Sequence, residues 1–185
     1  TVASVSFELV AAMIVISVAA VGYWFDDIIE LSAQLRILIS FAVGVLIVSA
    51  FVNWSGAYSL LLIFAICLAV GFVNVVFTNI VNFYDGADLN LATFIVLTAS
   101  FVLVFLPAHS EWWPITVACL AFIIPFAVMN SCPKTIYLGD SGSFVFASLL
   151  TLMVVSFFKD SQSIPSEAII PVALPAFDVF FVLLI

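Results

Sequence analysis

Apolar runs long enough to cross a lipid bilayer, or nearly so, are the feature that most constrains this chain. A spanning helix needs about 20 apolar residues, because the hydrocarbon core is about 30 Å thick and each residue advances the helix by about 1.5 Å. Residues 2–24 meet this requirement with Glu8 as their only charge. With 66% hydrophobic and 8% charged residues, the chain could not bury its apolar surface as a water-soluble fold does.

Seven such runs follow one another, and few show the alternation typical of a barrel strand. They are residues 2–24, 35–52, 57–78, 91–106, 115–129, 144–158 and 168–185. The sequence therefore predicts an all-α polytopic membrane helix bundle with about seven spanning helices. We expect residues 1–185 to form a single transmembrane domain and, because both ends fall inside apolar runs, a fragment of a longer polytopic protein.

Three polar segments interrupt the runs at alternate connections. They are the pair Asp26-Asp27, residues 79–88 and residues 130–143. If each run crosses the membrane once, these segments share one face, and the connections near Asn53, His109 and Lys159 share the other. Arg36 and Lys134 would lie on the acidic face, which by the positive-inside rule leans towards the cytoplasm.

Carboxylates in two of these segments suggest a cation site. Adjacent acids repel, so Asp26 and Asp27 favour a nearby metal ion or a proton-transfer role; the simpler interpretation is a solvated helix end. In the second segment, Asn79, Asn82 and Asp85 recur every third residue, as on one face of a helical ending. A capped helix end is the simpler alternative there.

The segment Gly139-Asp140-Ser141-Gly142 resembles the surroundings of the nucleophile in trypsin-like serine proteases. Its only histidine partner would be His109, which is expected on the opposite face, so that interpretation fails. A glycine-flanked turn that opens a helix fits better, with free N–H groups for a phosphate and Asp140 for a metal ion. The simpler alternative is a tight turn between helices.

Two further classes of function compete with an enzyme. Glu8 and Asp178 lie inside apolar runs, where acids are functional by default, so a cation or proton transporter could use them as a relay. The other acids gather at the ends of runs, which favours an enzyme over a transporter. A structural scaffold would leave the spacing of asparagine and aspartate unexplained. Eleven acids against three bases argue against a nucleic-acid partner.

Taken together, the motifs resemble those of the polyprenyl-phosphate N-acetylhexosamine-1-phosphate transferases. These membrane enzymes of glycosyl transferase family 4 move a sugar phosphate from a UDP-sugar to a lipid phosphate. The matching motifs are Asp26-Asp27 with Leu31-Ser32 and Arg36; Asn79-x-x-Asn82-x-x-Asp85-Gly86-x-Asp88; Asn130-x-x-Pro133 with residues 136–143; and Pro175-x-x-Asp178. The chain departs from the family in having Leu89 where a glycine is usual, and Lys134 directly after Pro133 rather than two residues beyond it.

The resemblance implies roles for residues of this chain. Asp140 would bind Mg²⁺, or alternatively Mn²⁺, with support from Asp85. Asp26 or Asp27 would deprotonate or position the lipid phosphate. The substrate-binding residues it implies are Asn82, Asp88, Asn130 and Tyr137, of which the last three would line a uridine pocket.

The implied reaction transfers N-acetylhexosamine 1-phosphate from a UDP-N-acetylhexosamine to polyprenyl phosphate and releases UMP. It would start the synthesis of a cell-envelope polysaccharide or glycolipid such as lipopolysaccharide. The expected location is the bacterial inner membrane with the active site on the cytoplasmic face, and a homodimer is left open.

Overall fold

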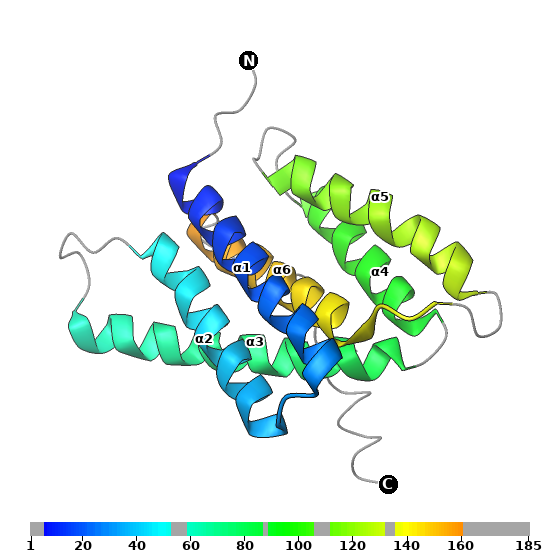
Figure 1. The fold of residues 1–185 in the computed structure, drawn as a ribbon. Helices are drawn as coiled ribbons and strands as arrows, with labels where there is room; N and C mark the ends of the chain where they lie inside the picture. The colour runs from blue at the N-terminus through cyan, green and yellow to red at the C-terminus, as the bar shows by residue number, and fades with distance from the viewer. Residues whose placement is uncertain (1–5, 53–58, 87–88, 106–111, 132–135, 161–185) are drawn as a thin grey trace, which may run out of the picture. The chain divides into compact units, whose positions relative to one another are not determined.

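Helices account for nearly all of the chain that the structure, a computed structural model, describes: residues 6–52, 59–86, 89–105, 112–131 and 136–160. They are α1 (Phe7–Ile29), α2 (Ala33–Phe51), α3 (Leu60–Asp85), α4 (Asn90–Phe105), α5 (Trp112–Asn130) and α6 (Gly139–Asp160), shown in Figure 1. No strand occurs within these ranges, so the predicted all-α class is confirmed.

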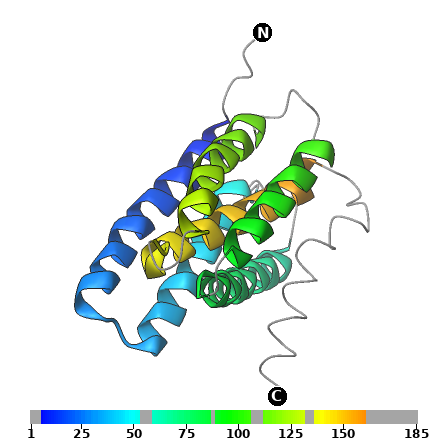
Figure 2. The same ribbon diagram turned by 90° about the vertical axis from the view of Figure 1, so that its right-hand side faces the viewer.

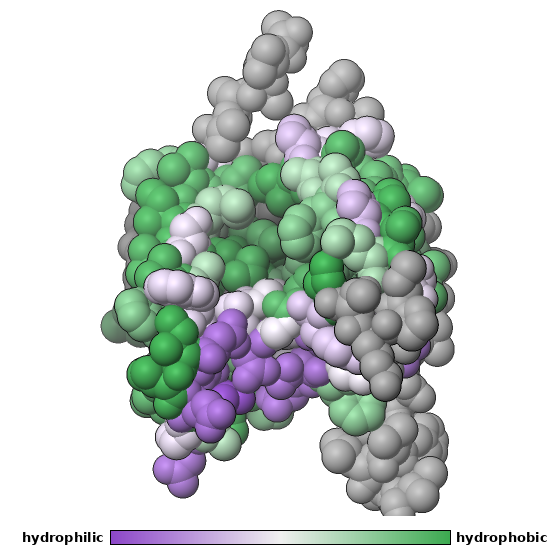
Figure 3. Space-filling model, turned by 45° about the vertical axis from the view of Figure 1, so that its right-hand side comes forward, coloured by the Kyte–Doolittle hydropathy of each residue, from purple (hydrophilic) through white to green (hydrophobic). Residues whose placement is uncertain are grey.

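Four of these helices, α1, α2, α3 and α5, are long and apolar enough to cross a membrane. The apolar stretches of α4 and α6 are shorter, and the expected run at 168–185 lies outside the described residues. Large apolar side chains such as Phe7, Leu60 and Val104 are exposed, as lipid contact requires. Figure 3 shows apolar residues over most of the face in view, with the most hydrophilic residues gathered in its lower part. A membrane protein is therefore confirmed, but the expected number of seven spans is not.

The chain forms two compact units. The four-helix unit contains Ser6–Asn82 and Leu138–Gln162, and so α1, α2, most of α3, and α6. The α4–α5 unit contains Phe83–Tyr137.

In the four-helix unit, α1 packs against both α2 and α6, and α2 also contacts α6. Figures 1 and 2 show α1 and α6 side by side. Near their polar ends the rings of Tyr23 and Phe144 stack, with centroids 4.0 Å apart and an interplanar angle of 14°. This contact places the end of α1 beside the start of α6.

Helix α3 crosses α2 where two glycines allow the backbones to approach closely. A Cβ on Gly44 would lie 2.7 Å from Asn74 Cβ and 2.9 Å from Gly71 Cα. Small residues at such crossings are typical of membrane helices, whose association depends on close packing and hydrogen bonds rather than on burial from water. The close approach brings the side chain of Asn74 into the centre of the unit.

Asn74 connects three helices through buried hydrogen bonds. Its Nδ2 donates to the backbone carbonyl of Ser40 on α2 at 2.7 Å. Its Oδ1 accepts from Thr151 Oγ1 on α6, also at 2.7 Å. A buried amide whose donor and acceptor are both satisfied holds the helices in one register.

Candidate functional site

Helix α1 ends later than the sequence suggested. It runs through Asp26 and Asp27 to Ile29 and is closed by Glu30, whose φ is 49° and whose N–H donates to Asp26 O at 2.9 Å. The predicted apolar run ended at residue 24, and the helix extends beyond it through both acids. The acids can remain helical because a partner for Asp26 lies within reach, so its charge is not left alone in an apolar environment.

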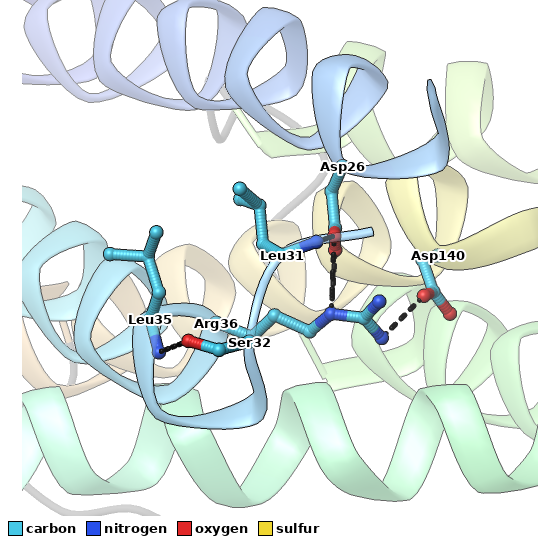
Figure 4. Close-up of polar contacts among 6 residues, drawn as sticks. All are labelled: Asp26, Leu31, Ser32, Leu35, Arg36 and Asp140. Atoms are coloured by element: carbon cyan, nitrogen blue, oxygen red, sulfur yellow. Dashed lines mark hydrogen bonds and ion pairs between the residues drawn. The ribbon is translucent and has the colours of Figure 1, made fainter. Parts of the chain in front are cut away.

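Asp26 is only 1% exposed, and its carboxylate is held from two sides (Figure 4). Oδ1 accepts the N–H of Leu31 at 2.7 Å, which fixes the connection that follows the helix. Arg36 Nε lies 2.9 Å from Oδ2 and 3.2 Å from Oδ1. A buried carboxylate is tolerable only with this kind of pairing, so Asp26 organises the connection between α1 and α2.

Arg36 bridges this carboxylate to Asp140. Its Nη1 lies 2.7 Å from Asp140 Oδ2, a charge-assisted bond across 104 residues of sequence. Ser32 caps α2 by accepting the N–H of Leu35 at 3.4 Å, which places Arg36 in the first turns of that helix. The guanidinium thus joins the end of α1 to the start of α6, and Figure 4 shows both ion pairs.

Asp27 also lies at the start of α6. Gly139, the first residue of that helix, has a φ of 72°, and a Cβ there would lie 3.8 Å from one carboxylate oxygen of Asp27. A negative charge is stabilised at this end of a helix by the free N–H groups and the helix dipole. Unlike Asp26, Asp27 is exposed. We call Asp26, Asp27, Arg36 and Asp140 the carboxylate–arginine cluster.

The Gly-Asp-Ser-Gly segment forms the first turn of α6, which confirms the predicted glycine-flanked turn that opens a helix. The expected sixth run began at residue 144, whereas the helix begins at Gly139. Asp140 is half-buried there and directed at Arg36.

The donors of the cluster are carboxylate oxygens, the ligands that Mg²⁺ and Mn²⁺ prefer, so their chemistry fits a divalent cation. Within the described residues no three acidic, histidine or cysteine side chains are arranged to hold a metal ion. In the cluster, the guanidinium of Arg36 lies between Asp26 and Asp140. Within the cluster, Asp27 is exposed and Asp140 is partly exposed.

In the α4–α5 unit, Asn130 ties together the segments next to the two helices. Its Oδ1 accepts the N–H of Leu89 at 2.7 Å, and its Nδ2 donates to Ile136 O at 2.9 Å. The start of α4 therefore lies beside the end of α5, as alternation of the runs predicts. Both polar atoms of this expected uridine-pocket residue contact the backbone.

The remaining predicted site residues lie at the end of α3 and after α5. Asn82 is exposed in the last turn of α3, whereas Asp85, its last residue, is 6% exposed. Tyr137 is 53% exposed, which leaves its ring accessible for stacking. Asp88 and Asp178 lie outside the described residues.

Sequence reasoning recognised Arg36 only as part of a motif and missed its position between two acids. A signal was present, since Arg36 is the only arginine of the chain and the only charged residue of α2. A lone guanidinium at such a position indicates an acidic partner nearby.

The described residues thus form apolar membrane helices with carboxylates gathered at the ends of α1 and α6. The model of one family, described as Glycosyl transferase family 4, matches residues 8–158, and the chain therefore belongs to that family. The matched residues include the whole carboxylate–arginine cluster. No curated protein and no solved structure matches the chain.

Membership of this family makes the chain a membrane glycosyl transferase domain. The alternative of an ion transporter gains no support from the comparison. Of the two acids on which that alternative rests, Asp178 lies beyond the matched residues and Glu8 is at their first position.

Proposed function

We propose that this protein transfers N-acetylhexosamine 1-phosphate from a UDP-N-acetylhexosamine to polyprenyl phosphate and releases UMP. The observation that supports the proposal best is the carboxylate–arginine cluster, which gathers three acids and one guanidinium at the ends of apolar helices. Family membership supports a transferase, and the sequence motifs favour these substrates.

The location of the cluster suits substrates from two phases. A UDP-sugar arrives from water, and a polyprenyl phosphate is held in the bilayer with its phosphate at the surface. Asp27 in the last turns of α1 and Asp140 in the first turn of α6 lie at helix ends, where both phosphates could be reached. Carboxylates near the middle of a span could not serve a water-soluble nucleotide.

The reaction is a phosphoryl transfer. An oxygen of the lipid phosphate forms a bond to the sugar-bearing phosphorus of the UDP-sugar, and the bond from that phosphorus to the bridging oxygen breaks. UMP carries away the bridging oxygen, while the bond between the sugar's anomeric carbon and its oxygen is untouched. Two anions must approach each other, so charge neutralisation and positioning dominate the barrier.

A bound Mg²⁺ or Mn²⁺ would supply that neutralisation by coordinating phosphate oxygens. We assign Asp140 to its binding because this carboxylate is partly exposed and offers the oxygen ligands that these cations prefer. The sequence resemblance adds Asp85; this residue belongs to the α4–α5 unit, and its contribution stays a prediction.

Exposure separates the roles of the paired acids. Asp27 is exposed, so we assign to it the positioning or deprotonation of the lipid phosphate. Asp26 is buried, with both oxygens held by Leu31 and Arg36, so we assign to it the positioning of Arg36. The uridine-binding roles of Asp88, Asn130 and Tyr137, and that of Asn82 with the sugar nucleotide, remain as the resemblance implies.

The proposed setting is the inner membrane of a bacterium with the cluster on the cytoplasmic face, where UDP-sugars are made, at the start of cell-envelope polysaccharide synthesis. A homodimer is compatible with this proposal.

The test measures UMP release by the full-length protein in nanodiscs. Release should require a UDP-N-acetylhexosamine, polyprenyl phosphate and Mg²⁺ together. Asp140→Asn should abolish it, whereas Glu8→Gln, at the other end of α1, should retain most of it. Ion flux in proteoliposomes without UMP release, lost in Glu8→Gln, would instead establish the transporter.

A further inference from the structure

The two ion pairs of Arg36 differ in how firmly they are held. On one side, the side chain of Asp26 is 0% exposed, and its Oδ1 also accepts a backbone N–H from Leu31. On the other side, the side chain of Asp140 is 28% exposed and contacts Arg36 through Nη1. Water screens the second pair more than the first, so the Asp140 contact is the one that can be exchanged.

We infer that Arg36 is a resident counter-ion of Asp140 that a divalent cation displaces, while its Nε remains on Asp26. The inference rests on the metal role given to Asp140 in the proposed function. It makes Arg36 a positioning residue that keeps the cluster together until the cation arrives.

Electrostatic repulsion explains why a divalent cation must replace Arg36 on Asp140 rather than bind beside it. Without a cation, Asp26, Asp27 and Asp140 repel one another, and Arg36 offsets part of that repulsion. A divalent cation on Asp140 Oδ2 cannot share that oxygen with a guanidinium Nη1 only 2.7 Å away, because the two positive charges repel. Cation binding is therefore opposed by the ion pair that it replaces.

Arg36 contacts the two acids through different nitrogen atoms, so the exchange requires movement only at the end of its side chain. Nε is the atom bound to Asp26 and Nη1 the atom bound to Asp140, so rotation near the end of the side chain can release one contact and keep the other. A lysine offers a single ammonium group instead of this fork. At position 36 it would retain a positive charge for Asp26 without the second arm that reaches Asp140.

The test compares arginine with lysine at position 36. Mn²⁺ binding to the purified full-length protein is measured by electron paramagnetic resonance, with no nucleotide or lipid phosphate present. Arg36→Lys should bind Mn²⁺ about tenfold more tightly than the wild type, because no ion pair on Asp140 has to be broken. Adding Asp140→Asn should abolish the gain. Lys159→Gln, which removes a positive charge at the other end of α6, is the matched control and should leave the affinity unchanged.

Thermal unfolding without metal establishes that each variant is folded. Should Arg36→Lys not fold, the double variant Asp26→Asn/Arg36→Gln removes both partners of the buried pair and carries the same expectation of tighter Mn²⁺ binding.

Each outcome has a distinct meaning. Saturable Mn²⁺ binding with equal or weaker affinity in the Arg36 variants would overturn the exchange and leave the metal role of Asp140 intact. Absence of saturable binding in the wild type and the Arg36 variants alike would overturn both. Tighter binding in Arg36→Lys without any UMP release by the wild type would support the exchange and contradict the proposed reaction.

Discussion

The backbone N–H of Leu89 donates to the side-chain Oδ1 of Asn130 at 2.7 Å, and Leu89 has a φ of 62°. Glycine is the residue that adopts this left-handed conformation without a steric penalty. The transferases that this chain resembles usually have glycine at the equivalent position. In this chain leucine adopts that conformation in the turn before α4, where Asn130 holds its backbone N–H from the end of α5.

Leu89→Gly should stabilise the protein by about 1 kcal/mol. A left-handed conformation costs a residue with a Cβ about 1–2 kcal/mol, partly offset by the greater freedom of glycine in the unfolded chain. Little packing is lost, since Leu89 is 40% exposed. Thermal unfolding in detergent measures the change. Leu97→Gly is the control, because Leu97 is 61% exposed inside α4 and glycine there should destabilise by about 1 kcal/mol.

Gly44→Ala should destabilise the four-helix unit by about 1–3 kcal/mol. The added methyl would lie 2.8 Å from Val70 O and 2.9 Å from Gly71 Cα, which are backbone atoms of α3 and cannot rotate away. Gly22→Ala offers the matched comparison: apart from its own helix backbone and its chain neighbours, no atom lies within 4 Å of its Cβ position, so alanine there should be neutral or stabilising. Equal unfolding temperatures for the two variants would show that α2 and α3 are not in close contact.

Thr151→Val should destabilise by about 1–2 kcal/mol although its shape is nearly unchanged. It removes the donor to Asn74 Oδ1 and leaves that buried atom without its partner on α6. Thr151→Ser keeps the hydroxyl and should retain most of the stability. Unfolding of both variants is measured together, and a valine variant as stable as the wild type would argue against the hydrogen bond.

Asp26→Asn should mainly reduce stability, whereas Asp27→Asn should mainly reduce UMP release. Loss of the buried charge at Asp26 weakens the pair with Arg36 and should lower the free energy of unfolding by about 3 kcal/mol. Asp27 is exposed, so its variant should unfold at nearly the wild-type temperature while its UMP release falls by about 100-fold or more. Unfolding temperature and turnover are measured on the same preparations. Full turnover in Asp27→Asn would remove this residue from the proposed role.

Much of the fold could be predicted from local sequence. A run of apolar residues must form a helix in lipid, because every backbone N–H and C=O needs a partner within the segment. This requirement depends on residue type alone, so the all-α class followed from the sequence and so did the position of polar segments near the helix ends. The same reasoning brought Asp27 and Asp140 to one end of the four-helix unit, as the structure confirms.

The hydrophobicity of the sequence could not predict which of the two adjacent acids is buried. Asp26 and Asp27 are neighbours in sequence, but successive residues on a helix point about 100° apart, so one is buried and the other exposed. Which one is buried depends on where α2 and α6 pack against α1. The later end of α1 has the same origin, because Arg36 supplies the charge that allows Asp26 to remain helical.

Apolar runs and the bilayer thickness thus determined that the chain forms membrane helices with acids at their ends. Only the tertiary structure decided that Arg36 joins Asp26 to Asp140, that Asn74 connects three helices and that Leu89 is left-handed. Helix formation is governed by neighbours within a few residues. The contact of Arg36 with Asp140, both hydrogen bonds of Asn74 and the bond from Leu89 to Asn130 instead join residues 34 to 104 positions apart, which only helix packing brings within hydrogen-bond distance.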